Sequence, residues 1–391
     1  MALSAVLLIG AGLLTASLRN LQNQQFGFEP QGRLMARVDP SLADYTPEKL
    51  YGLYQQLEQR LPQIPGVVSA SYSLYSPMRG DNWGYGIHIE GHSPDERAGA
   101  SFDRVGPHYF ETIGTRLLRG RVIGDEDTPT SRRVAVVNQA FVRKFFPKED
   151  PIGKHFGMGD ATHAGDFDIV GVVEDAKYTN AREPARQTFF LPFLQTVTDR
   201  QPSYNTAMLR SNYMGDIELR IVGKPENLEA AFRRTLAHID PNLTVLNIQT
   251  FAEQLTLNFN QDRLIARLTE LFGLLALILA CVGLYGVTAY SVARRTSEIG
   301  IRMALGANRG NVLGLVLRGA LLQLGLGLGV GIPVALAGGR LLDSQLYGVK
   351  SHDPVILGLA VVALAACALV AGFVPARRAA SIDPMRTLRT E

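Results

Sequence analysis

The sequence predicts a membrane protein with four transmembrane α-helices and one large α+β domain outside the cytoplasm. Four uncharged apolar runs lie at the two ends of the 391-residue chain. Three of them reach the roughly 20 residues that a helix needs to cross a bilayer. Between the first and second runs, Pro, Gly and charged residues are frequent, as in a soluble domain. A soluble domain held between two membrane helices accounts for this pattern.

The first apolar run extends from Ala2 to Leu18 and is slightly short for a membrane crossing. A cleaved signal peptide is the alternative to a retained helix. Signal peptides begin with a basic region, however, and the first charge here is Arg19. A chain that starts part-way through a natural helix would also explain the shortness. We predict a transmembrane helix at residues 1–18.

Further crossings are predicted at about residues 271–293, 313–339 and 355–376. The net charge of +3 does not indicate nucleic-acid binding, because arginines lie beside the apolar runs rather than being gathered on one soluble face. By the positive-inside rule, the link after the second crossing and the tail after the fourth are cytoplasmic. The relevant arginines are Arg294, Arg295, Arg302 and Arg309 in the link, and Arg377, Arg378, Arg386 and Arg389 in the tail.

The outer domain contains two strand–helix–strand repeats. The first is predicted at 33–38, 47–61 and 67–75, and the second at 216–222, 225–238 and 243–249. Two such units can share one antiparallel sheet with both helices on one face, the split βαβ arrangement of ferredoxin-like folds. The residues between them form an inserted, mainly β subdomain, with predicted strands at 134–137 and 167–173, a helix at 139–146 and a loop at 157–166.

The junction with the second crossing is predicted to be a single helix. Thr250 is a suitable N-cap, and no Pro or Gly follows before Gly273. A continuous helix would form a rigid stalk that couples the outer domain to the membrane.

The densest motif is the string SVARRTSEIGIRMALGA at residues 291–307. With further strings at 117–121, 134–138, 150–154, 169–173 and 375–380, it resembles the FtsX/MacB-type family of ABC transporter permeases, in particular one half of the tandem-duplicated members. The resemblance implies a bacterial inner-membrane protein with a MacB-like periplasmic core domain and stalk at 19–262, an FtsX-like permease domain at 263–376 and a cytoplasmic tail at 377–391. It also implies a separate cytoplasmic ATPase. The cytoplasmic sequence that usually precedes the first crossing in this family is missing here.

The sequence has no phosphate-binding loop of its own. Gly153-Lys154 is followed by His and Gly223-Lys224 by Pro, so neither pair ends in the Ser or Thr that the motif requires. No Gly-x-Ser-x-Gly or His-Glu-x-x-His motif is present either. We predict no catalytic residues and no cofactor, with ATP bound only by a partner subunit.

The cytoplasmic link is the predicted contact with that ATPase, through Arg294, Arg295, Glu298, Ile299, Ile301, Arg302, Leu305 and Gly306. A short helix there would place Ile301 and Leu305 on one face, with Glu298 and Arg302 as an ion pair one turn apart. Such a helix can dock in a groove of another protein. The alternative is that the arginines only anchor lipid headgroups; the family resemblance favours docking.

Gly325, Gly327, Gly329 and Gly331 form two overlapping Gly-x-x-x-Gly pairs in the third crossing. They predict close packing of another helix, from a second permease half or a homodimer, although membrane helices are commonly rich in glycine. His88, Glu90 and His92 alternate as strand-borne metal ligands would, but Gly91 and Pro94 indicate a strand end. We predict a structural or solvated face there and no metal site.

These observations predict a permease or mechanotransmission subunit, which couples a partner ATPase to movement of the periplasmic domain for export or periplasmic client handling. The alternative is a membrane-anchored extracytoplasmic sensor or binding module without transport. The expected partners are an ABC ATPase subunit, a second permease half or copy, the lipid membrane, and periplasmic or outer-membrane proteins, with no nucleic acid. The sequence selects no substrate.

Overall fold

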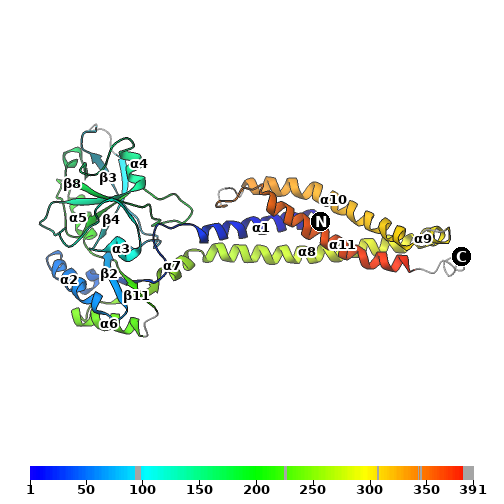
Figure 1. The fold of residues 1–391 in the computed structure, drawn as a ribbon, viewed down its shortest axis with the longest axis horizontal. Coiled ribbons are helices and arrows are strands. Elements are labelled where there is room, and N and C mark those ends of the chain that lie inside the picture. The colour runs from blue at the N-terminus through cyan, green and yellow to red at the C-terminus, as the bar shows by residue number, and fades with distance from the viewer. Residues whose placement is uncertain (93–97, 224–226, 306–307, 342, 344–345, 382–391) are drawn as a thin grey trace. The chain divides into compact units, whose positions relative to one another are not determined.

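The computed structural model describes the chain except for residues 93–97, 224–226, 306–307, 342, 344–345 and 382–391. It divides into two compact units (Figure 1). The membrane unit contains Met1–Gln24 and Phe259–Glu391, and the outer unit contains Gln25–Asn258.

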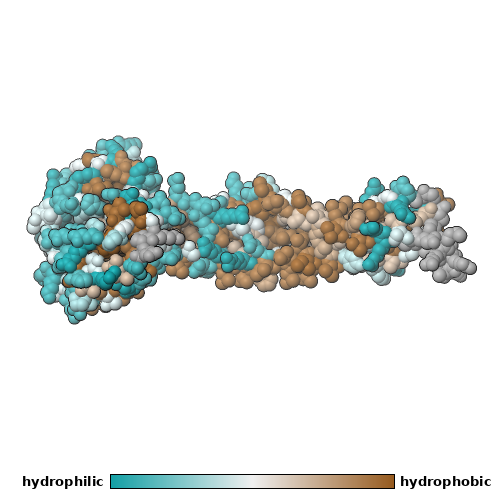
Figure 2. Space-filling model, turned by 60° about the horizontal axis from the view of Figure 1, so that its bottom comes forward, coloured by the Kyte–Doolittle hydropathy of each residue, from teal (hydrophilic) through white to brown (hydrophobic). Residues whose placement is uncertain are grey.

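Four long apolar helices make up most of the membrane unit: α1 (Ala2–Asn23), α8 (Asn260–Arg294), α10 (Arg309–Leu341) and α11 (Pro354–Ala380). All four are long and apolar enough to cross a membrane, as the sequence predicted. Small and aliphatic side chains fill the space between the helices, including Ala5, Leu284, Ala320, Leu364 and Ala368. Large apolar side chains cover the outside of the bundle, where Figure 2 shows a continuous hydrophobic band.

The two ends of the bundle differ in composition. At one end, the link between α10 and α11 lies against the C-terminal part of α1: the Tyr347 amide donates a hydrogen bond to Ser17 Oγ (2.8 Å), and Asn20 Nδ2 donates one to the Gly348 carbonyl (3.0 Å). At the other end, Ile299 of the short helix α9 (Thr296–Ala304) packs against Ala379 in the last turn of α11. The arginine-rich link and the start of the arginine-rich tail therefore share one end, as the positive-inside rule requires.

One part of the outer unit is the predicted ferredoxin-like fold. Its sheet has the order β11-β1-β10-β2, and every neighbouring pair is antiparallel. Tyr72 on β2 stacks on Tyr54 of α2, whereas Ser69, three residues away, meets Thr112 of α3. Because side chains alternate along a strand, α2 and α3 cover opposite faces. The elements are β1 (Arg33–Val38), α2 (Pro47–Arg60), β2 (Val67–Ser73), α3 (Tyr109–Ile113), β10 (Asp216–Ile221), α6 (Leu228–Ile239) and β11 (Val245–Thr250), with 3-10 turns at Pro40–Ala43 and Leu61–Gln63.

The inserted subdomain is a closed β-barrel. Strands β4-β3-β7-β8-β6-β9 follow one another, and β9 pairs back with β4 in parallel. Phe102, Phe156 and Phe189 are among its fully buried side chains. The sequence predicted β6, α4 and β8 but neither the other strands nor the closure. The elements are β3 (Trp83–Ile89), β4 (Ala98–Val105), β5 (Leu117–Gly120), β6 (Val134–Asn138), α4 (Gln139–Phe145), β7 (His155–Met158), the 3-10 turn η3 (Ala161–His163), β8 (Phe167–Val173), β9 (Thr188–Pro192) and α5 (Pro202–Ser211).

The prediction of one uninterrupted stalk helix is wrong. Thr250 does cap a helix, because its Oγ1 accepts from the Glu253 amide (3.1 Å) while Glu253 Oε2 accepts from the Thr250 amide (2.8 Å). That helix, α7 (Phe251–Asn258), ends at Asn258, and α8 begins only at Asn260. Asn258 Nδ2 donates to the Met78 carbonyl (2.7 Å), which holds the end of α7 to the outer unit. Phe259 lies between the helices in a non-helical conformation (φ −97°, ψ 5°).

Candidate functional site

Helix α9 is fixed to the bundle by one face. It follows α8 after a single non-helical residue, Arg295. Ile299 is 3% exposed and packs against Val312 of α10 and Ala379 of α11. Of the predicted contact residues, Ile299 is therefore an anchor of α9 rather than part of its exposed surface.

The opposite face of α9 is exposed. Ile301 is 47% exposed and Leu305, just after the helix, is 84% exposed. Glu298 and Arg302 form the predicted ion pair one turn apart (2.5 Å), and both side chains are about half exposed. Such a pair adds little stability, so the charges mainly define the border of the apolar patch.

The arginines before α9 are also exposed. Arg294 and Arg295 face solvent, and the Arg294 guanidinium lies 5.9 Å from the centre of the Tyr290 ring. Gly306, the last residue of the predicted contact, lies outside the described residues.

The four glycines of α10 separate into two pairs with different surroundings. A Cβ atom at Gly331 would lie 2.9 Å from both the Ala2 carbonyl and the Ala5 side chain, and one at Gly327 would collide with Met1. The N-terminal segment of the same chain, with the start of α1, therefore packs directly against these two glycines. A Cβ at Gly325 or Gly329 would meet no described atom within 4 Å. Only this second pair is available to another helix.

Sequence reasoning did not select the group of buried acids in the outer unit. Asp103 on β4 and Glu218 on β10 are both fully buried. Ser73 and Ser76 each donate a hydroxyl hydrogen bond to Glu218 Oε1 (2.5 Å), and Arg79 pairs with the neighbouring Asp216. Burial, with the added charge of Asp216, raises the pKa of Glu218 to about 8. Burial and the nearby Glu218 raise the pKa of Asp103 well above its ordinary value.

The stretch considered as a metal site does not converge on one point. His88 is 7% exposed, whereas Glu90 Oε2 accepts from His155 Nδ1 (2.6 Å) and His92 is exposed. Pro94 lies outside the described residues.

A cleft of about 260 Å³ lies between α2 and the loops of the inserted subdomain. Aromatic and acidic side chains line it, among them Tyr51, Tyr72, Phe193, Glu58 and Asp125. Glu58 Oε1 accepts from the Tyr72 hydroxyl (2.6 Å), and burial raises the pKa of Glu58. The cleft depends on side chains far apart in the sequence, so no local motif could predict it.

Comparison with known families gives two matches. The MacB-like periplasmic core domain matches residues 1–237, and the FtsX-like permease C-terminal region matches residues 270–384. The periplasmic region of MacB from Actinobacillus actinomycetemcomitans is similar in structure, with 14% identity, a TM-score of 0.39, and coverage of 62% of this chain and 98% of that one.

Curated relatives include two proteins called macrolide export ATP-binding/permease protein MacB. The one from Marinobacter nauticus is 27% identical over 286 residues, which is 70% of this chain and 41% of the relative. The one from Bartonella henselae is 25% identical over 401 residues, or 99% and 56%. The pyoverdine export ATP-binding/permease protein PvdT of Pseudomonas savastanoi pv. phaseolicola is 24% identical over 293 residues, or 73% and 42%. The chain thus spans about half the length of the curated relatives it matches.

The core-domain match covers more than half of the chain, and the permease match covers α10, α11 and most of α8. With four such helices and an α+β domain between the first two, this is an inner-membrane protein whose outer unit is periplasmic. The chain belongs to the family of the MacB-like periplasmic core domain, here joined to an FtsX-like permease region.

Proposed function

We propose that the chain is the permease subunit of an ABC-type transporter, and that a separate cytoplasmic ATPase drives it by pushing on helix α9. The proposal rests on the contrast between the two faces of α9: Ile299 is buried in the bundle, while Ile301 and Leu305 are exposed. This sequence carries no phosphate-binding loop, and we assign ATP hydrolysis to the partner subunit.

The exposed face of α9 has the character of a docking surface. Two large aliphatic side chains lie there beside Glu298 and Arg302, so the surface is charged as well as apolar, unlike the lipid-facing surface of the bundle. An apolar helix face with charged borders suits a groove in another protein.

Movement of α9 has a direct route through the membrane unit. Only Arg295 separates α9 from α8, whose 35 residues extend roughly 50 Å. A pocket of about 70 Å³ lies beside Arg295 and Ile299, lined mainly by residues of α8 and α10. The chain passes between the two units after Gln24 and after Asn258, so the break at Phe259 would act as a hinge in this route.

The open glycine pair supplies the partner surface within the membrane. Gly325 and Gly329 would let a helix of a second permease half, or of a second copy of this chain, approach closely. The relatives named for macrolide and pyoverdine export make export of a small molecule the expected activity, with periplasmic client handling as the other use of the same movement.

Ile301→Asp and Leu305→Asp test the coupling. In complexes extracted from native membranes, we expect an ATPase to co-purify with the wild-type chain, and each variant to reduce its recovery or its turnover at least tenfold, because a charge would enter an apolar contact. Leu42→Asp is the matched control, since Leu42 is a 64% exposed leucine of the outer unit. Equal recovery and turnover in all three variants would refute the role of α9.

The cleft beside Tyr51 and Phe193 supports the second candidate function, a periplasmic sensor without transport. In that case no ATPase would co-purify. A ligand bound by the wild-type chain would instead be lost on Tyr51→Ala.

A further inference from the structure

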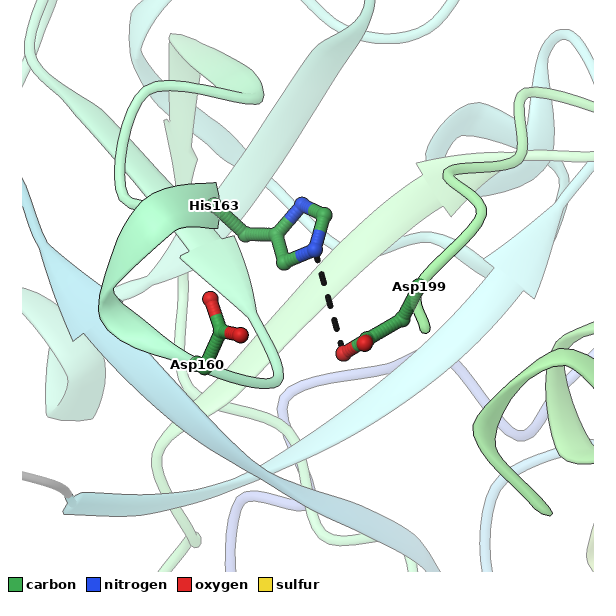
Figure 3. A group of neighbouring side chains, drawn as sticks. All are labelled: Asp160, His163 and Asp199. Carbon is green, nitrogen blue, oxygen red and sulfur yellow. Dashed lines mark ion pairs between the residues drawn. The ribbon is translucent and has the colours of Figure 1, made fainter. Parts of the chain in front are cut away.

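Three potential metal ligands converge in the inserted subdomain of the outer unit, apart from every site described above. Asp160 precedes the turn η3, His163 ends it, and Asp199 lies in the segment between β9 and α5. One ligand atom from each lies within 4.8 Å of the other two. Figure 3 shows the Asp160 and Asp199 carboxylates on the same side of the His163 ring.

Asp199 is the most informative of the three. Its side chain is 2% exposed, and Oδ1 accepts a hydrogen bond from the Gln201 amide (3.1 Å). The other oxygen, Oδ2, has no hydrogen-bond partner among the described residues and lies 3.8 Å from His163 Nε2. That separation is too long for a hydrogen bond. A buried carboxylate oxygen without a partner is costly, and a cation between Oδ2 and Nε2 would compensate for that cost.

The backbone holds Asp199 in this position. Asn205 of α5 accepts from the Asp199 amide (2.9 Å) and donates to its carbonyl (2.8 Å). Gly159 contributes by its lack of a side chain, because a Cβ there would lie 2.9 Å from Asp199 Oδ2. The site is therefore shaped before any ion binds.

His163 is oriented for metal binding through Nε2. Its Nδ1 lies 2.6 Å from Asp166 Oδ2 and can donate to this carboxylate, which leaves Nε2 as the nitrogen nearest Asp199. A carboxylate behind a histidine fixes the tautomer and the ring orientation in many metal sites.

Asp160 provides the third ligand and the solvent-exposed side of the site. It is exposed, and its Oδ1 accepts from the Thr162 amide (2.8 Å) and hydroxyl. These hydrogen bonds hold the Asp160 carboxylate in one position at the exposed edge of the site. The exposed position leaves a path for an ion and room for water as a further ligand.

We propose that Asp160, His163 and Asp199 bind one divalent transition-metal ion, with Zn²⁺ as the best fit. A histidine nitrogen among the ligands disfavours Mg²⁺ and Ca²⁺, which prefer all-oxygen sites. Tetrahedral zinc ligands at about 2.0–2.2 Å lie roughly 3.4 Å apart. The 3.8 Å between Nε2 and Oδ2 needs only a small contraction. The bound ion would join the loop after β7 to the segment before α5 and stabilise the barrel.

The test uses the full chain, purified in detergent without a histidine tag and freed of metal, with Zn²⁺ alone or Co²⁺ alone as the probe. We expect one Zn²⁺ per chain, a rise in Tm on its addition, and visible Co²⁺ absorption with a nitrogen and oxygen ligand set. His163→Ala and Asp199→Asn should each abolish all three signals. Asp166→Asn should weaken Zn²⁺ binding about 10- to 100-fold, because it removes only the orienting carboxylate.

The Tm of the metal-free Asp199→Asn variant shows whether Asp199 is a metal ligand or a residue that the fold itself needs. Because the carboxylate is buried without a partner on Oδ2, its neutralisation should leave the metal-free Tm unchanged or raise it. His238→Ala, at an exposed histidine of α6, is the matched control and should retain full binding. The proposal is wrong if His163→Ala and Asp199→Asn bind Zn²⁺ like the wild type, if His238→Ala loses binding equally, or if the wild type binds none.

Discussion

The membrane unit and the periplasmic unit of this chain distribute apolar and charged side chains in opposite ways. The membrane unit exposes large apolar side chains, such as Leu322 at 70% and Leu326 at 74%, and packs its helices through small residues such as Ala320 and Gly331. The periplasmic unit places charged side chains in its interior, with Asp103, Arg104 and Glu218 fully buried. The difference follows from the solvent: lipid provides no hydrophobic drive between helices, so close fit decides packing there. In the periplasmic unit, burial of aromatic residues offsets the cost of an internal polar network.

The buried Arg104 gives the largest expected effect. Its Nε donates to Ser211 Oγ (2.8 Å), and its Nη1 donates to the carbonyls of Pro192 (2.9 Å) and Gln195 (3.0 Å). Arg104→Leu would leave these buried acceptors unpaired and should lower the free energy of unfolding by about 3 kcal/mol. Urea denaturation followed by the fluorescence of Trp83, the single tryptophan of the chain and a residue of the outer unit, would measure this.

Arg220→Leu is the control for that substitution, because Arg220 is partly exposed and its ion pair with Glu111 (3.4 Å) is at the surface. Its effect should be within about 0.5 kcal/mol. Equal effects of the two substitutions would mean that the buried hydrogen bonds of Arg104 contribute no more to stability than a surface ion pair.

The buried Glu218 should make the stability of the outer unit depend on pH. Its folded pKa of about 8 is above the ordinary value of 4.5, so the folded state binds the proton more tightly than the unfolded state. The stabilisation of the folded state by protonated Glu218 is complete below about pH 4.5 and is lost as the pH rises to about 8. The Tm of the outer unit should therefore fall by roughly 5 °C or more between pH 5 and pH 8.5.

Glu218→Gln should flatten this dependence, because the amide keeps an oxygen that can accept from Ser73 and Ser76 without becoming charged. Differential scanning calorimetry across the pH series measures both proteins. An unchanged slope in the variant would show that another group titrates.

Close fit in the membrane unit is tested at one glycine of each pair. Gly331→Leu should overpack the contact with Ala2 and Ala5 and destabilise the bundle by about 1–3 kcal/mol. Gly329→Leu should leave the monomer folded, because its Cβ would meet no described atom nearby. Thermal stability in detergent and the yield of monodisperse protein distinguish the two. Equal loss in both would mean that glycine content, rather than the contact with α1, matters.

The elements that could be predicted from sequence are those with a local signal. Apolar length indicated the four crossings, and β1 and β8 were predicted at their observed bounds because apolar alternation or a β-branched run marks them. The closed barrel could not be predicted, because the parallel pairing of β4 with β9 joins residues more than 80 positions apart. The stalk was wrong for a related reason: Asn258 ends α7 through a bond to Met78, a residue remote in the sequence.

In the candidate sites, too, features with a local sequence signal could be predicted, and features that depend on remote residues could not. Helical spacing predicted the exposed face with Ile301 and Leu305, but not that Ile299 would be an anchor, because Val312 and Ala379 come from two other helices. The glycine spacing predicted close packing without showing which pair α1 occupies. Asp160, His163 and Asp166 recur every three residues in the sequence, which was a usable signal, whereas Asp199 joins them only through the fold.

Contact between α9 and a cytoplasmic ATPase can be tested directly with a photo-crosslinking amino acid in place of Leu305, in cells that express the full chain. Leu305 is 84% exposed beside the anchored helix α9, so we expect a crosslink to a cytoplasmic subunit that carries a phosphate-binding loop. The same probe in place of Leu42 on the periplasmic unit should give no such product. A crosslink from position 305 only to lipid or to periplasmic proteins would show that α9 does not dock a cytoplasmic ATPase.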